Sequence, residues 1–168
     1  MKTNLSTLMS IIGEEEAKFN MYGRELKNHV YNVSIQELNG NVTVMEDYKA
    51  DFEKELTEYV ELQKKITTIK SIIHQKNNEF KLSDGRTIQS AIIDNTNLRK
   101  MKMTYYNLLQ MKNSKARVTE VNNSYFECKT VNFDEKEIRE EFDRLESKIQ
   151  ETDFEIFKLN SIEFEVDI

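Results

Sequence analysis

Proline and tryptophan are absent from this sequence, and glycine occurs only four times in 168 residues. Proline and glycine are the residues that most often interrupt helices, so their scarcity predicts long, unbroken helices. The composition is 38% apolar and 32% charged, a balance that suits long two-faced helices better than a thick globular core.

Cysteine is represented by Cys128 alone, which excludes an intrachain disulfide and any metal site built from several cysteines. One cysteine fits a reducing compartment. Long apolar runs are also missing: Ile11-Ile12 is soon followed by Glu14-Glu15-Glu16, which excludes a signal peptide or membrane span there. We therefore expect a soluble protein of the bacterial cytoplasm, or of a host cell's cytoplasm if a phage encodes it.

The chain has no excess of positive charge, because thirty acidic and twenty-four basic residues give a net charge of −6. A dedicated nucleic-acid binder needs a basic surface to displace counterions from phosphates. An electrostatic membrane anchor needs one as well. Neither nucleic acid nor a membrane is therefore an expected partner.

What the sequence does contain is apolar residues at steps of three and four, which is typical of a helix with one buried stripe. Asn39-Gly40 predicts a turn, and Thr43 with Glu46 resembles a capping box that starts the next helix. Asp134, with Glu137 three residues later, predicts the start of the last helix. The predicted helices cover residues 4–33, 44–80, 87–112 and 135–159.

Residues 117–133 are rich in strand-favouring side chains on both sides of Asn122-Asn123-Ser124, so they predict a small β-hairpin. After Asn160, apolar and acidic residues alternate, as in an edge strand or a strand that pairs with a neighbouring chain. The predicted fold class is mainly α: long antiparallel coiled-coil-like helices with a small β-hairpin inserted before the last helix. No linker or repeat divides residues 1–168, so we expect a single domain.

The length of the second predicted helix favours self-association. From Val44 to Glu79 it would be roughly 54 Å long, whereas a compact monomer of this size has a radius of gyration of only ~15 Å. Part of the helix should then protrude, and its apolar stripe should meet another subunit. The first expected partner of the chain is therefore a second copy of itself.

Arg86 is the main candidate for a ligand-binding residue. It follows Gly85 and precedes a predicted helix start at Thr87, where free N–H groups and the helix dipole attract anions. Arg99, on the same predicted helix, joins these three residues as a candidate. Two interpretations stay open: a small anionic ligand binds at the turn, or Arg86 only pairs with Asp84 or with another subunit's carboxylate.

Other reactive residues lack the neighbours that catalysis or metal binding would need. His29 and His74 have no second histidine at ligand spacing, which indicates surface or subunit-contact roles. Cys128 has no activating neighbour in the sequence and is expected to be a small buried strand residue. There is no phosphate-binding glycine loop, nucleophile elbow or zinc signature, so we expect no catalytic residues, no metal, no cofactor and no enzyme activity.

The second half of the chain resembles the septicolysin-like family of small helical bacterial proteins of uncharacterised function. The resemblance rests on Leu82 to Ile92, Leu98-Arg99, Glu127-Cys128-Lys129, Val131-Asn132-Phe133 and Leu145 to Gln150. It implies a helical, oligomeric fold and no particular chemistry. Where that family has an Asn-Trp pair, this chain has Asp153-Phe154, and it continues further.

Three hypotheses follow for the function. The first is a non-enzymatic, homo-oligomeric binding or assembly protein. The second is an oligomeric sponge that sequesters a small anionic ligand, such as a nucleotide signal, in a phage anti-defence role. The third is a helix–hairpin–helix chaperone or adaptor that grips partners with exposed tips, a hypothesis that rests on fold analogy.

Overall fold

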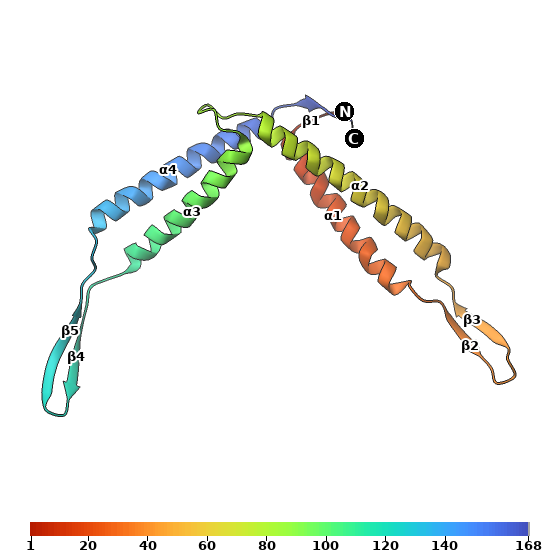
Figure 1. Ribbon diagram of the computed structural model, residues 1–168, viewed down its shortest axis with the longest axis horizontal. Coiled ribbons are helices and arrows are strands. Elements are labelled where there is room, and N and C mark those ends of the chain that lie inside the picture. Colours follow the sequence, from red (N-terminus) through yellow and green to blue (C-terminus); the bar gives the residue numbers. More distant parts are fainter. Residues whose placement is uncertain (168) are drawn as a thin grey trace. The chain divides into compact units, whose positions relative to one another are not determined.

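The computed structural model describes residues 1–167 and is mainly helical, as the sequence predicts. Its elements follow one another as a short strand, then helix–hairpin–helix twice, then a short strand (Figure 1). The elements are β1 (Lys2–Thr3), α1 (Leu5–Asn28), β2 (Val33–Gln36), β3 (Val42–Glu46), α2 (Lys49–Glu79), α3 (Ile88–Gln110), β4 (Ser114–Glu120), β5 (Asn123–Lys129), α4 (Glu135–Asn160) and β6 (Phe164–Glu165).

The chain packs into two compact units. The first comprises Met1–Glu79 with the C-terminal segment from Asn160, and the second comprises Phe80–Leu159. The sequence showed no boundary between them, because no linker composition marks residue 80. The single domain expected over residues 1–168 stays a prediction, since packing into two units does not decide whether the units fold independently.

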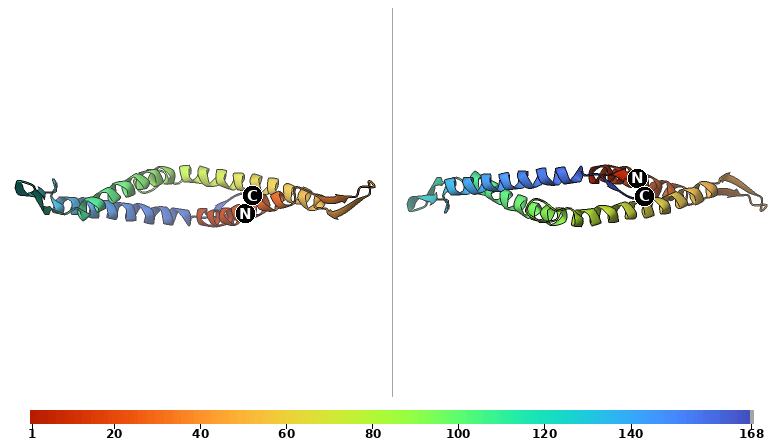
Figure 2. Two further views of the ribbon diagram at one scale, coloured as in Figure 1. Left: turned by 90° about the horizontal axis from the view of Figure 1, so that it is seen from below. Right: turned by 90° about the horizontal axis from the view of Figure 1, so that it is seen from above.

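In the first unit, α1 and α2 lie side by side, as all the ribbon views agree (Figure 2). Leu5 and Leu8 of α1 and Ile69 of α2 are completely buried. Farther along, the rings of Phe19 and Tyr59 stack with their centroids 4.1 Å apart. The predicted apolar stripes of both helices therefore do face each other here.

The region between α1 and α2 corrects the sequence prediction. Helix α1 ends at Asn28 instead of residue 33, and α2 begins at Lys49 instead of residue 44. Between them β2 and β3 form an antiparallel hairpin, with Thr43 inside β3, so the predicted capping box at Thr43 is wrong. The physical reason is local: Val and Ile alternate with polar residues on both sides of Asn39-Gly40, which favours strands. Gly40 supplies the positive φ of 91° that the turn requires.

The C-terminal strand β6 pairs with β1 in antiparallel register, so that Thr3 lies opposite Phe164. The sequence suggested that the tail would pair at an edge but not that its partner would be the N-terminus. The ammonium of Lys76 lies 5.1 Å from the ring centroid of Phe164. The last residue of the predicted tail pattern, Ile168, lies outside the described residues.

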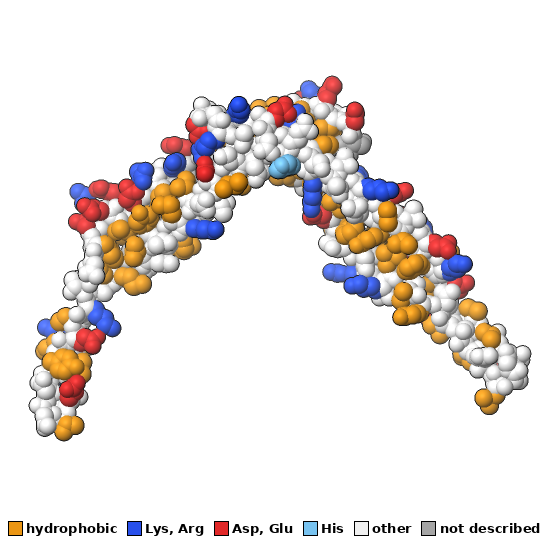
Figure 3. All heavy atoms as spheres, viewed as in Figure 1, with side chains coloured by type: hydrophobic (Ala, Val, Ile, Leu, Met, Phe, Trp, Pro, Cys, Tyr) orange, Lys and Arg blue, Asp and Glu red, His pale blue; other side chains and the backbone are white. Residues whose placement is uncertain are grey.

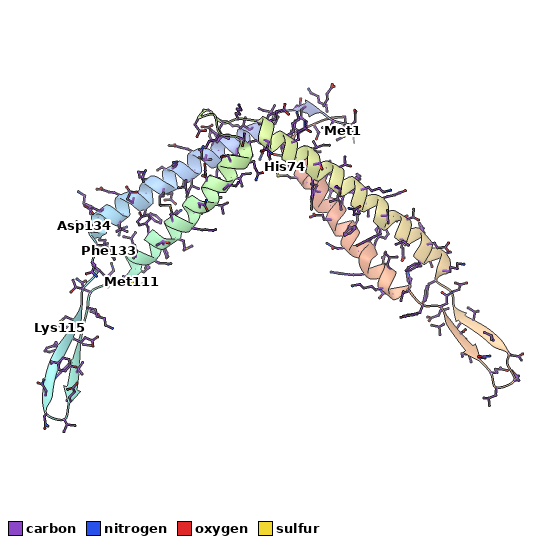
Figure 4. The ribbon with its side chains drawn as sticks, in the orientation of Figure 1. Met1, His74, Met111, Lys115, Phe133 and Asp134 are labelled. Atoms are coloured by element: carbon purple, nitrogen blue, oxygen red, sulfur yellow. The ribbon has the colours of Figure 1, made fainter. Side chains whose placement is uncertain are left out.

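In the second unit, α3 and α4 flank a hairpin formed by β4 and β5. The hairpin occupies 114–129 instead of the predicted 117–133, and the amide of Val131 donates to the side chain of Asn113 just beyond its open end. Asp134 caps α4 as predicted: its carboxylate accepts from the backbone amides of Lys136 and Glu137 at 2.7 and 3.4 Å. Figure 4 shows Met111, Phe133 and Asp134 where the helices meet the hairpin.

The core of the second unit is thin. Its fully or nearly fully covered apolar side chains are Leu82, Ile88, Ala91, Leu109, Leu145 and Ile149. Leu145, Ile149 and Thr152 follow one another along α4 at steps of four and three, as in a helix with one buried stripe, and all three are buried. A single pair of helices can cover only one stripe on each helix. Much apolar surface therefore remains exposed.

Candidate functional site

The turn that precedes α3 is built by its own backbone. The amide of Leu82 donates to the carbonyl of Arg86 at 2.8 Å, and the amide of Gly85 donates to the carbonyl of Leu82 at 3.0 Å. Gly85 has a φ of +87°, which any other residue would adopt only under strain. Thr87 caps α3, because its hydroxyl accepts from the amide of Ser90 at 3.1 Å. The sequence-predicted turn and helix start are therefore both present.

Arg86 is already paired inside the chain. Its Nη2 lies 2.6 Å from Asp84 Oδ2, its Nε donates to the same oxygen at 2.8 Å, and its Nη1 donates to Asp94 Oδ2 at 2.9 Å. The bonds to Arg86 hold the pKa of Asp84 below its usual value and raise the pKa of Arg86 itself. The pairing with Asp84 that one interpretation expects is therefore present, with Asp94 as an additional partner, and ligand binding at the turn stays a prediction.

The turn is also tied to α4. The hydroxyl and the amide of Ser83 donate to the two carboxylate oxygens of Glu155 at 2.7 and 2.8 Å. These two hydrogen bonds lower the pKa of Glu155, and the one from the backbone amide has the larger effect. Glu155 therefore positions the turn against the last helix.

Arg99 belongs to a separate cluster. Its Nη2 donates to Asp153 Oδ1 and Oδ2 at 2.7 and 2.6 Å. Beside it Asn95, only 1% exposed, donates through Nδ2 to Asp153 Oδ1 at 2.9 Å and to the carbonyl of Ile149 at 3.3 Å. Its Oδ1 is buried without a hydrogen-bond partner among the described residues. Asn95, Arg99 and Asp153 thus form the polar link between α3 and α4.

Next to this link lies a groove of about 500 Å³, which is the size of a small-ligand site. Apolar side chains dominate its lining, and Figure 3 shows hydrophobic side chains running between α3 and α4 on the face drawn. Two cations stand at the groove, and both are paired: Arg99 with Asp153, and Lys102 with Glu146 at 2.6 Å. The lining residues are Arg99, Lys102, Met103, Tyr106, Phe142 and Ile149.

The candidate residues from the sequence do not form one site. Gly85, Arg86 and Thr87 are neighbours in the turn, whereas Arg99 lies roughly 17 Å along α3 from the helix start. Sequence reasoning missed Lys102 and Met103, which line the groove together with Arg99. The available signal was the spacing of Met103 from Arg99, because residues four apart share one face of a helix.

The first unit holds a polar cluster of its own. Glu15 is buried between α1 and α2, and its Oε1 lies 3.0 Å from Lys65 Nζ and 3.4 Å from Lys18 Nζ. The hydrogen bond from Lys65 lowers the pKa of Glu15 against the effect of burial. Close by, a hydrogen bond to Glu58 raises the pKa of Tyr22. These side chains line a cavity of about 310 Å³.

The remaining reactive residues take simple environments. His29 Nδ1 lies 2.9 Å from Glu55 Oε1, and the imidazole ring stacks on Tyr48. Cys128 is exposed on β5, so the expectation of a buried cysteine is wrong: a two-stranded hairpin has no covered face. Within residues 1–167, His, Cys, Asp and Glu side chains form no cluster of three or more that could hold a metal ion.

Comparison with protein families matches residues 24–167 to a family of unknown function, DUF6847. The chain belongs to this family. A search of curated proteins finds no match. Among solved structures, a functionally unknown conserved protein from Corynebacterium diphtheriae is similar, with a TM-score of 0.64 at 19% identity, covering 98% of this chain and 100% of that one. At that identity the likeness concerns the fold.

In the described part of this DUF6847 member, none of the helices is both long and apolar enough to cross a membrane. Exposed large apolar side chains lie on the helices and on both hairpins. The candidate functional surfaces are therefore the groove between α3 and α4, the exposed helix faces and the two hairpins.

Proposed function

We propose that this chain is a non-enzymatic, homo-oligomeric binding or assembly protein of the cytoplasm, whose helix pairs associate through their exposed apolar faces in a coiled-coil-like manner. The proposal rests mainly on surface area. Two separate compact units of half this mass would together expose roughly 10,400 Å². The chain exposes 12445 Å².

The difference of about 2,000 Å² is what one subunit buries in a large obligate interface. A helix pair exposes more surface than a compact domain of equal mass because each helix has only one covered face. Further copies of the chain would cover these exposed helix faces.

The exposed apolar side chains on α3 support this proposal. Ile92, Met103 and Tyr106 are 40%, 59% and 49% exposed. Their spacing of eleven and three residues puts them on one face of the helix. Removing such a face from water stabilises an assembly by about 25 cal/mol for each Å² of apolar area.

Sedimentation equilibrium at micromolar concentration tests this proposal. We expect an oligomer for the natural chain, and dissociation for Met103→Lys, because a buried ammonium without a partner opposes assembly. The control is Thr104→Lys, which adds the same charge one residue along, on an exposed part of α3. A compact monomer of the natural chain would exclude the proposal.

A second candidate function is sequestration of a small anionic ligand, in the manner of a sponge for a nucleotide signal. The groove beside Arg99 favours it, since an apolar lining with two cations suits an amphipathic anion. Calorimetry with a nucleotide panel tests it. We expect Arg99→Ala, which removes a cation from the lining of the groove, to abolish binding, and Arg86→Ala, which lies outside that lining, to leave binding intact. If no nucleotide binds, this candidate is rejected.

A third candidate is a chaperone or adaptor that holds other proteins by its hairpin tips. Leu38 and Val121, beside the two hairpin turns, are fully exposed apolar side chains. Affinity purification with the natural chain and with Leu38→Ser/Val121→Ser tests it, and recovery of the protein alone counts against it.

The septicolysin-like resemblance stays part of the proposal and adds no activity to it.

A further inference from the structure

Each helix pair ends in an isolated two-stranded sheet. The hairpins β2–β3 and β4–β5 pair with no third strand in residues 1–167. Every residue of β2, β3 and β5 is exposed, and in β4 only Val118 is partly covered. A lone two-stranded hairpin is marginally stable in water, and its open edges are templates for another strand. Both hairpins therefore offer open edges to a partner strand.

The two hairpins carry opposite charge. Residues 30–47, around β2 and β3, contain the acidic residues Glu37, Glu46 and Asp47 and no lysine or arginine, a net charge of −3. Residues 111–133, around β4 and β5, contain four basic residues (Lys112, Lys115, Arg117, Lys129) and two acidic ones (Glu120, Glu127), a net charge of +2. In Figure 3, basic side chains lie over β4–β5 and none lie over β2–β3 on the face drawn.

The charges are placed where strands would meet. Lys115 and Arg117 lie two apart on β4, on the same face as Phe126, which is paired with Arg117 in the hairpin register. The Lys115 ammonium lies 4.4 Å from the Phe126 ring centroid. Strand β3 offers the exposed apolar residues Val42 and Val44, and it ends at Glu46. Opposite charges and apolar side chains on adjacent strands stabilise a sheet.

We propose that the β2–β3 hairpin of one copy pairs edge to edge with the β4–β5 hairpin of a second copy, with β3 beside β4, to form a four-stranded sheet. This inference rests on the proposed oligomer and adds a specific contact to it. The contact joins different surfaces of the two copies, so repeating it closes a ring or extends a filament.

Charge exchange between copies tests the contact. Glu37→Lys/Glu46→Lys changes the charge of residues 30–47 from −3 to +1, and Lys115→Glu/Arg117→Glu changes that of residues 111–133 from +2 to −2. In each variant alone, both hairpins then have one sign of charge. We expect at least a tenfold rise in the dissociation constant for each variant, measured by sedimentation. In an equal mixture every contact between the two different variants joins opposite charges, so association should return.

The control is Lys64→Glu/Lys100→Glu, which makes the same change of charge as Lys115→Glu/Arg117→Glu but at exposed positions of α2 and α3. It should leave the dissociation constant within twofold. If the mixture of the two hairpin variants stays dissociated, or if neither variant weakens an oligomer that Met103→Lys does dissociate, the hairpin contact is refuted while the oligomer stands. If the natural chain is a monomer, the proposed function itself fails.

Cross-linking covers the case in which charge reversal unfolds a hairpin. One chain carries Cys128→Ser with Val44→Cys on β3, and the other carries Cys128→Ser with Ala116→Cys on β4. A short bismaleimide should join the two different chains into a covalent pair at more than tenfold the yield obtained when Asn97→Cys replaces Ala116→Cys. Equal yields for the two combinations would overturn the proposal.

Discussion

The substitution Asn95→Asp tests how strongly the polar link between α3 and α4 depends on an amide. Asn95 is 1% exposed, and its Nδ2 donates to Asp153 Oδ1 and to the carbonyl of Ile149. An aspartate has the same shape but presents an acceptor to these two acceptors. Burial and the neighbouring carboxylate both raise the pKa of the new carboxyl, so it must be protonated in the folded state.

The magnitude follows from linkage. Holding a carboxyl with an ordinary pKa of about 3.9 protonated at pH 7 costs about 1.4 kcal/mol per pH unit, or at most about 4 kcal/mol. Arg99 also contacts Asp153 and offsets part of this cost. We therefore expect Asn95→Asp to lower the free energy of unfolding by about 3 kcal/mol at pH 7. The sign is fixed by the raised folded-state pKa: the variant loses stability as pH rises from 4 to 7. Near pH 4.5 the loss should fall below about 1 kcal/mol.

Urea denaturation of the natural chain and the variant at pH 4.5, 5.5 and 7 measures these differences. Asn97→Asp is the matched control, because Asn97 is exposed on the same helix and its substitution should change stability by no more than about 0.5 kcal/mol. A loss for Asn95→Asp that does not vary with pH, or that equals the control at pH 7, would refute the reasoning.

Three further predictions concern single residues. Gly85→Ala should destabilise the protein by about 1–2 kcal/mol, because the backbone at this position has a φ of +87°. Gly13→Ala should stabilise the protein by up to about 1 kcal/mol, because Gly13 lies in α1 and nothing lies within 4 Å of the added methyl group. Thermal denaturation of the two variants compares these effects. Lys65→Met should lower the free energy of unfolding by about 1–3 kcal/mol at pH 7, because it removes the hydrogen bond that lowers the pKa of buried Glu15. Urea denaturation should show that this loss shrinks below about pH 4, where the Glu15 carboxyl becomes protonated. Cys128, exposed on β5, should react with a thiol reagent in the native protein nearly as fast as in urea.

Different results would contradict each of these. Equal shifts in melting temperature for the two glycine substitutions would show that φ does not limit the turn. A loss for Lys65→Met that grows on acidification would have the wrong sign, because a lowered folded-state pKa contributes stability only above it. A thiol that reacts only after unfolding would mean that β5 is covered, as an associated copy would cover it.

Local sequence rules were most successful where one short segment decides the structure. Asp134 caps α4 because its carboxylate and the free amides are at most three residues apart. The same rules fail over residues 33–46: the helical spacing predicts that α1 continues past Asn28, whereas the strand-favouring residues on both sides of Asn39-Gly40 form a hairpin. Helix and strand patterns are both compatible with a few apolar residues in a short segment, so neighbouring turn residues must decide between them.

The candidate site was predicted less completely than the fold. The turn at Gly85 and the helix start at Thr87 follow from residue types alone, because positive φ and an N-cap are local requirements. The partners of Arg86 do not follow from local rules: Asp84 is a neighbour in sequence, but Asp94 reaches Arg86 only after α3 has formed. Lys102 and Met103 became site candidates only once α4 had supplied the opposite wall of the groove.

The amino-acid sequence by itself therefore determined that this protein is mainly helical, where its sharpest turns lie and that it has little apolar material for a thick core. These properties depend on backbone sterics and composition, which act within a few residues. Only the tertiary structure decided that β1 pairs with β6, that Asn95 is buried against Asp153 and that two hairpins of opposite charge have open edges. Such contacts join residues far apart in the chain, and they exist only when packing brings those residues together.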